Sequence, residues 1–228
     1  VWVNRIWMHH FGEPLVDTPS DFGLRTKQPV HHQLLNYLAS ELLENGWHTK
    51  PIHQLIVSSR AYQRASRLGD SAQLARQQTD DPDNRYLWRV NRRRLDLEQM
   101  RDTLLVVSGN IDYSMYGRPP LITDANNRRR TVYSFVERQS VPNVVKTFDF
   151  ASADTSTARR ITTTVPQQAL FAMNSTFVSD TAASVAHRLL ENDQPIRDRV
   201  DRVYSIVLGR SPSPEETVLC EQFLSAGG

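Results

Sequence analysis

Two pairs of adjacent histidines near the start of the chain are the first residues that could do chemistry. They are His9-His10 and His31-His32, and Asp17 and Asp21 lie between them. Imidazole and carboxylate groups are zinc ligands. Adjacent histidines on a helix point to different faces, so each pair could give at most one ligand to a given site. We therefore predict structural or surface histidines and no metal ligands, with a metal site as the alternative.

Arginine is the second residue type that could take part in binding or catalysis. The chain holds 24 Arg and three Lys, although its net charge is only +2. Three clusters stand out: Arg89 with 92–94, 128–130, and 159–160. Guanidinium groups contact carboxylates, sulfates and phosphates in bidentate geometry. The clusters therefore either pair internally or, where two converge, form an anion-binding surface. The small net charge argues against nucleic acid as a partner.

Catalytic signatures are missing from the sequence. There is no Gly-x-Ser-x-Gly motif, Gly-rich phosphate loop or dinucleotide fingerprint. There is no Cys-x-x-Cys-His motif either, so we expect no cofactor in this chain. The single cysteine, Cys220, lies among apolar residues and is typical of a buried small side chain. No apolar run is long enough to span a membrane.

The elements that must position these residues are mostly helices, because apolar residues recur every three to four positions. Asp96 with Gln99 and Ser213 with Glu216 predict capping boxes, and Thr49 is the expected N-cap of another helix. The helices over 34–57 also resemble a helix-turn-helix DNA reader, but short helix pairs are common. Helices are expected over 2–11, 34–43, 49–56, 97–109, 142–148, 166–190 with a break at 174–176, 197–208, and from Pro214 onwards.

Long loops separate these helices. We expect loops over 66–84, with one helical turn at 72–77, and over 112–129. Residues 131–136 are β-branched and aromatic and predict a strand, which 86–90 would pair with. No flexible linker divides the sequence. The prediction is a single, mostly α, irregular helical domain over 1–228, with at most a small two-stranded β element.

Several short signatures resemble one known family when they are taken in order. They lie at 3–12, 15–23, 34–47, 53–63, 81–95, 130–138, 159–174 and 208–212. This set is similar to domain-of-unknown-function family 1553, a Planctomycete-specific domain of large cytochrome-type proteins. The resemblance covers nearly the whole chain. It implies an excised C-terminal part of an exported multidomain protein, located in the periplasm or outside the cell. It also implies that other domains of the same polypeptide are partners, and that haem c occurs only on a separate domain.

The family has no assigned activity, so function must be inferred from the residues. We predict a non-catalytic interaction or scaffold module that binds an anionic or sugar polymer, such as a sulfated or acidic polysaccharide. The alternative is an enzyme acting on polysaccharide, for which six side chains should meet at one concave surface: Arg5, His9, Asp21, Arg92, Arg160 and Gln167. A scaffold instead predicts that these side chains pair off in buried Arg–carboxylate and Arg–carbonyl contacts. The expected ligand-binding residues are Arg5, Trp7, His9, Asp21, Arg92, Arg94, Arg160 and Gln167.

Overall fold

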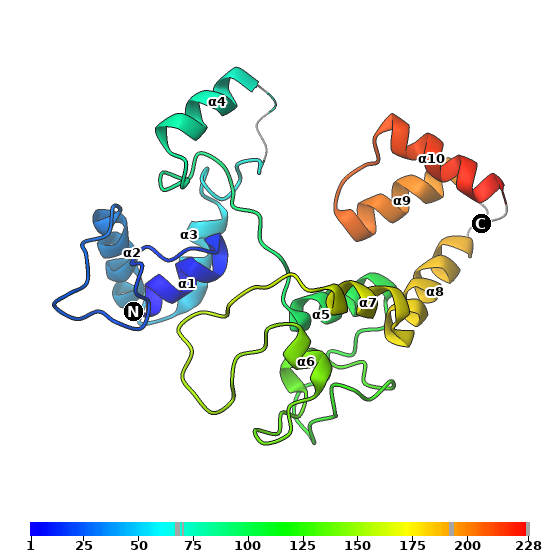
Figure 1. Ribbon diagram of the computed structural model, residues 1–228, viewed down its shortest axis with the longest axis horizontal. Helices are drawn as coiled ribbons and strands as arrows, with labels where there is room; N and C mark the ends of the chain where they lie inside the picture. Colours follow the sequence, from blue (N-terminus) through cyan, green and yellow to red (C-terminus); the bar gives the residue numbers. More distant parts are fainter. Residues whose placement is uncertain (67–68, 70, 192–193, 227–228) are drawn as a thin grey trace. The chain divides into compact units, whose positions relative to one another are not determined.

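The chain is mostly α-helical, as predicted. The computed structural model describes residues 1–66, 69, 71–191 and 194–226. Within these ranges it has ten α-helices, one 3₁₀ turn and two isolated β-bridges, and no paired strands (Figure 1). None of the helices in these ranges is both long and apolar enough to cross a membrane. The helices are α1 (Trp2–Phe11), α2 (His32–Glu44), α3 (Thr49–Val57), α4 (Ser71–Asp80), α5 (Leu97–Ser108), α6 (Asn143–Thr147), α7 (Pro166–Asn174), α8 (Thr176–Leu190), α9 (Ile196–Leu208) and α10 (Pro214–Ser225).

The chain divides into two compact units. The first unit is Val1–Arg94 with Thr157–Arg159, and the second unit is Leu95–Ser156 with Arg160–Gly228. Each unit has its own buried hydrophobic cluster. The single domain over 1–228 stays a prediction, and the two units are described separately below.

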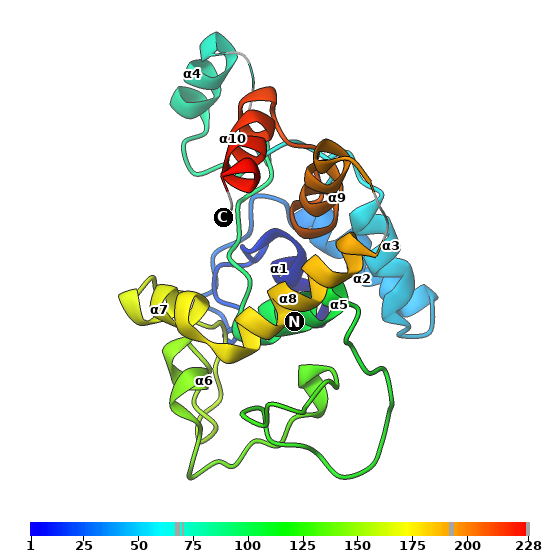
Figure 2. The ribbon, with the colours of Figure 1, turned by 90° about the vertical axis from the view of Figure 1, so that its right-hand side faces the viewer.

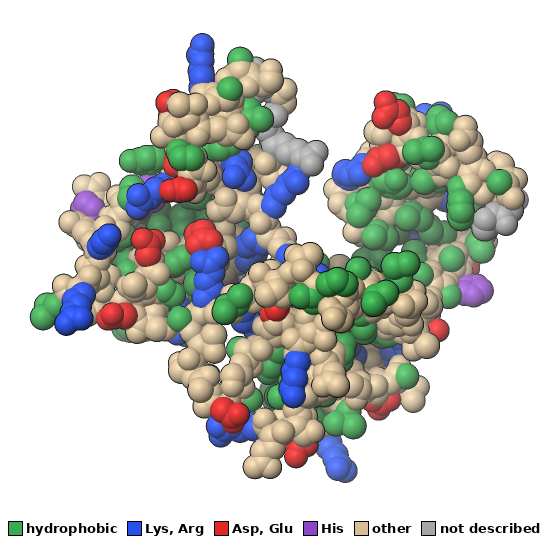
Figure 3. Space-filling model, viewed as in Figure 1, with side chains coloured by type: hydrophobic (Ala, Val, Ile, Leu, Met, Phe, Trp, Pro, Cys, Tyr) green, Lys and Arg blue, Asp and Glu red, His purple; other side chains and the backbone are tan. Residues whose placement is uncertain are grey.

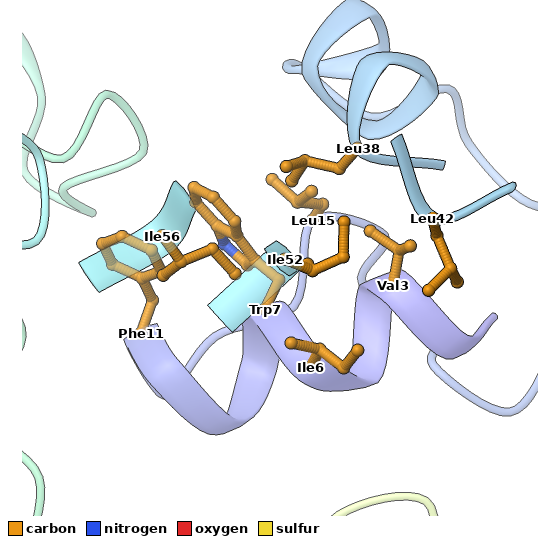
Figure 4. Packing of buried hydrophobic residues seen from close by; sticks show 9 residues of the cluster. All are labelled: Val3, Ile6, Trp7, Phe11, Leu15, Leu38, Leu42, Ile52 and Ile56. Carbon is orange, nitrogen blue, oxygen red and sulfur yellow. The ribbon is translucent and has the colours of Figure 1, made fainter. Parts of the chain in front are cut away.

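The core of the first unit lies where α1, α2 and α3 meet. α1 places Phe11, which is 2% exposed, against Ile56 of α3, and Trp7 stacks on Phe11 with ring centroids 4.1 Å apart (Figure 4). Ile52 of α3 is fully buried, and Leu38 of α2 lies on the opposite side of the cluster. The spacing of three to four residues in each helix therefore points one apolar stripe inward, as the sequence predicted.

A buried asparagine attaches the loop after α1 to that helix. Asn4 is 0% exposed. Its Nδ2 donates to the carbonyl of Val16 at 3.1 Å, and its Oδ1 accepts from the N–H of Val16 at 2.9 Å. The side-chain amide thus satisfies both backbone groups of Val16, which is itself 3% exposed. The first signature in the sequence is therefore structural at this position.

A second polar cluster organises the segment after α4. The Asp81 carboxylate accepts from the N–H groups of Arg85 and Tyr86, both at 2.8 Å. Its carbonyl accepts from the Trp88 indole at 2.9 Å. Asn84 donates to the Asn91 side chain. The residues of the signature over 81–95 therefore hydrogen-bond to one another within a loop. The prediction of a strand at 86–90 is wrong.

In the second unit, α5 and α8 lie side by side (Figure 2). The buried cluster of this unit consists of Leu97, Val145 and Phe148. The Phe171 ring packs edge-on against the Phe148 ring, with the ring centroids 5.4 Å apart. Arg188 of α8 donates to the carbonyl of Val107 at the end of α5, at 2.8 Å. α9 and α10 pack against each other.

Most predicted helix boundaries are confirmed. Asp96 with Gln99 and Ser213 with Glu216 form capping boxes at α5 and α10. The expected break in the long helical segment lies between α7 and α8, at Asn174 and Thr176. One prediction is wrong: His48 is the N-cap of α3, and Thr49 is its first helical residue.

Two segments differ from the prediction. Residues 131–136 form no paired strand: a 3₁₀ turn covers Thr131–Tyr133, and Phe135 makes only an isolated bridge to Leu121. The expected loop over 66–84 contains the whole of α4, and the single helical turn expected at 72–77 lies within that helix. Residues 67, 68 and 70 of this segment lie outside the described part of the chain. α4 has no buried residue and its only apolar side chains are Ala72, Leu74 and Ala75, so the apolar signal from which helices are predicted is weak.

Candidate functional site

The side chains of α5 in the second unit build a buried polar network. Arg101 is only 5% exposed. It donates to the carbonyl of Arg129 at 2.8 Å, to the Thr131 hydroxyl at 3.1 Å, and to the carbonyl of Asn127. Burial is the main reason that the pKa of Arg101 is lowered. The guanidinium therefore fixes residues 127–131 to α5.

Asp102 completes this arrangement from the next position on the helix. Its Oδ1 accepts from the Thr131 N–H at 2.7 Å and from the Thr131 hydroxyl at 2.6 Å. The Thr131 hydroxyl thus accepts from Arg101 and donates to Asp102. The Asp102 Oδ1 and the nearest guanidinium nitrogen of Arg101 are 3.9 Å apart, which is a long ion pair. The Thr131 hydroxyl also connects the two side chains, because it hydrogen-bonds to both. This network holds the segment that leads into the 3₁₀ turn.

A cavity of about 390 Å³ lies beside this network and within the second unit. That size falls in the range of small ligand pockets. Its polar wall includes Glu98 and Asp102, which are one helical turn apart on α5, and Arg130. The rest is mostly apolar, and its walls include Val132, Phe135, Val136, Val141, Val145 and Phe150.

The charged groups on this wall already have partners. Glu98 accepts from Arg160 in bidentate geometry, at 2.8 and 2.9 Å, and the Arg160 guanidinium lies 5.0 Å from the Phe150 ring centre. Burial alone would raise the pKa of Glu98, but hydrogen bonds from Arg160 and from the backbone outweigh it, so this pKa is lowered. The hydrogen bonds to Glu98 in turn raise the pKa of Arg160. The cavity therefore suits an apolar group better than a charged polymer.

The described residues offer little for metal chemistry. Within them, no three His, Cys, Asp or Glu side chains gather closely enough to hold a metal ion. A second cavity, of about 220 Å³, shares Ile122 with the first and is also lined by Arg101, Arg128, Asp124 and Asp180. Its two cations and two carboxylates balance in charge.

Six of the eight predicted ligand-binding residues belong to the first unit. Trp7 is 7% exposed and packed in the core, whereas His9 on the same helix is exposed and Arg5 is half-buried. The Asp21 carboxylate accepts from the N–H of Gly23 at 3.0 Å and so shapes its own loop. The remaining two members of this set, Arg92 and Arg94, are exposed.

The other two predicted residues belong to the second unit. Arg160 is bound to Glu98, as described above. Gln167 is exposed on the first turn of α7, whereas its neighbour Gln168 is buried and donates to the carbonyl of Thr147 at 2.8 Å. The partners found for these eight residues therefore lie outside the set. Their role in ligand binding stays a prediction.

Of the residues for which a scaffold predicts buried pairing, Arg160 pairs with a carboxylate, and Arg159 and Arg129, outside that set, make more exposed contacts of the same kind. Arg159 binds Glu13 in bidentate geometry with both distances 2.6 Å, and Arg160 binds Glu98. Arg129 donates to the carbonyls of Ser114, Arg118 and Tyr116. Guanidinium groups in all these cases hold loops in place.

Arg101 and Asp102 were not identified from the sequence. A signal was present, because Arg101 lies four residues after Leu97 and four before Leu105, on the buried face of the helix. A charged residue in an apolar stripe indicates a buried polar network.

Comparison with known proteins supports the resemblance found in the sequence. A family model described as "PSD1: Protein of unknown function (DUF1553)" matches residues 1–224. No curated protein and no solved structure matches the chain.

Proposed function

The chain belongs to the PSD1 family of proteins of unknown function (DUF1553), and we propose that it is a non-catalytic interaction module of an exported multidomain protein. The proposal rests on one observation, the apolar cavity of the second unit. Val132, Phe135 and Val136 lie on its wall and are 71%, 44% and 48% exposed. Large apolar side chains around a preformed cavity are typical of a protein interaction site.

A second group of exposed hydrophobic side chains supports the same function. Hydrophobic side chains are also gathered on α9 and α10 (Figure 3). Val207, Leu208, Val218, Leu219, Phe223 and Leu224 are each 45–66% exposed there. We propose that another domain of the same polypeptide covers part of this surface.

Replacing Val136 with glutamate should abolish docking at the cavity. The charged side chain would have to lose its hydration to enter an apolar contact. The remaining part of the native polypeptide, expressed separately, should bind the Val136→Glu chain at least tenfold more weakly than the unaltered chain, measured by calorimetry.

Val106→Glu is the matched control. Val106 on α5 is 49% exposed, nearly the same as Val136, but it does not line the cavity. Its substitution should leave the affinity within twofold. Equal losses in the two variants, or no association of the unaltered chain, would contradict the proposed docking site.

Polyanion binding is a second candidate function, favoured by the arginines of the first unit. Arg92, Arg93 and Arg94 are consecutive and all exposed. If they contact an anionic polysaccharide, Arg92→Gln with Arg94→Gln should lower the salt concentration that elutes the chain from immobilised heparin. Arg197→Gln with Arg202→Gln removes two exposed arginines of α9 and is the control. If both double variants elute at the same lowered salt concentration, binding to heparin depends only on the net charge of the chain and not on Arg92 and Arg94.

A further inference from the structure

Two histidines of the first unit contact each other directly. His10 lies near the end of α1 and His53 lies in α3, and the His10 Nε2 and His53 Nδ1 atoms are 2.8 Å apart. The ring centroids are 5.1 Å apart. With the two nitrogens 2.8 Å apart, the ring centres can be as far apart as 5.1 Å only if both nitrogens lie close to the line that joins the centres. The contact is therefore a head-on N–H···N hydrogen bond.

The number of protons on the pair decides whether this bond exists. A neutral imidazole has one N–H and one lone pair, so a neutral pair can form the bond. A first added proton goes to the outer nitrogen of the donor ring and leaves the bond in place. A second proton must occupy the accepting nitrogen. Two N–H groups then face each other, and the bond cannot form.

The surroundings of His10 oppose its protonation. His10 is half-buried, and Tyr62 packs edge-on against it at 5.6 Å. The titratable and charged groups that face it are His53 of α3, Tyr62, His9 of its own helix, and Arg93. Burial first, and then the charges of His53, Arg93 and His9, lower the pKa of His10.

We infer that the His10–His53 contact is an acid-sensitive link between α1 and α3, closed while the pair holds at most one added proton and open when both rings are protonated. The link joins two of the three helices that enclose the core of the first unit. Acid would therefore loosen α1 and α3 locally while the second unit is unaffected.

The direction of the pH dependence follows from the lowered pKa. The unfolded chain binds protons at His10 more readily than the folded chain does. Stability from this contact is thus fully present above the unfolded pKa, about 6.5, and is lost as pH falls through the folded value. As the pH falls below 6.5, the opening constant for amides of α1 and α3 should rise, by at most about tenfold per pH unit for each proton taken up on opening. Hydrogen exchange, corrected for its intrinsic pH dependence, measures this constant.

His53→Asn is the decisive variant, because its side-chain amide can either accept from or donate to His10 but cannot be protonated at these pH values. Opening of α1 and α3 should then change less than twofold over the same range. His53→Ala removes the partner of His10 and should raise opening already at pH 7. His187→Gln removes an exposed histidine of α8 and should keep the pH dependence of the unaltered chain. The inference is wrong if His53→Asn retains the full acid response, or if ¹⁵N spectra show protons on both facing nitrogens at pH 7.

Discussion

Replacing Arg101 with methionine should lower the free energy of unfolding of the second unit by about 3 kcal/mol. Methionine fills much of the same volume but donates no hydrogen bond. The carbonyls of Asn127 and Arg129 and the hydroxyl of Thr131 would lose their donor. Buried acceptors without a partner each cost about 1–3 kcal/mol. Urea unfolding followed by circular dichroism measures the change.

The matched control makes the same substitution at an exposed arginine. Arg197→Met on α9 should change the unfolding free energy by less than about 0.5 kcal/mol. If Arg101→Met were equally neutral, the cost of burying the guanidinium would cancel its three hydrogen bonds. The network would then fix the loop geometry without adding stability.

Replacing Asn4 with leucine should destabilise the first unit by about 3 kcal/mol. The substitution removes both hydrogen bonds to Val16 and leaves its buried N–H and carbonyl without partners. Asn4→Asp should cost more at neutral pH, because it loses the donor and buries a charge. Thermal unfolding of both variants measures the difference.

Two features of this prediction can be checked independently. Acid should partly restore Asn4→Asp, because a protonated carboxyl can donate to the Val16 carbonyl again. Asn36 is exposed on α2, so Asn36→Leu should have little effect. A loss of equal size at Asn36 would show that added hydrophobicity, and not the buried amide, is responsible.

The helices could be predicted because their signals are local. Apolar stripes fixed α1, α2 and α5, and capping residues placed the starts of α5 and α10. The 131–136 segment has strand propensity, but Asp102 binds the Thr131 N–H and a 3₁₀ turn follows. This hydrogen bond comes from a residue 29 positions earlier in the chain. Local propensity is overridden by such contacts.

The candidate site could be predicted only in part, for the same reason. Pairing of Arg160 with Glu98 agrees with the contacts expected of a scaffold, whereas the Arg159–Glu13 pair was not predicted and is half exposed. The cavity and the contact between His10 and His53 depend on how segments cross in space. Adjacent histidines alone do not indicate that one of them meets a ring 43 residues away.

The exposed hydrophobic side chains of α9 and α10 have a consequence for how the chain unfolds. Both the urea m-value and the heat capacity of unfolding scale with the area that becomes hydrated when a protein unfolds. Side chains that are already hydrated in the native state, such as Leu219 and Phe223 at 66% and 65% exposed, add little to that area. The transitions of the chain in urea and on heating should therefore be broad, and they should sharpen once a partner domain covers these side chains.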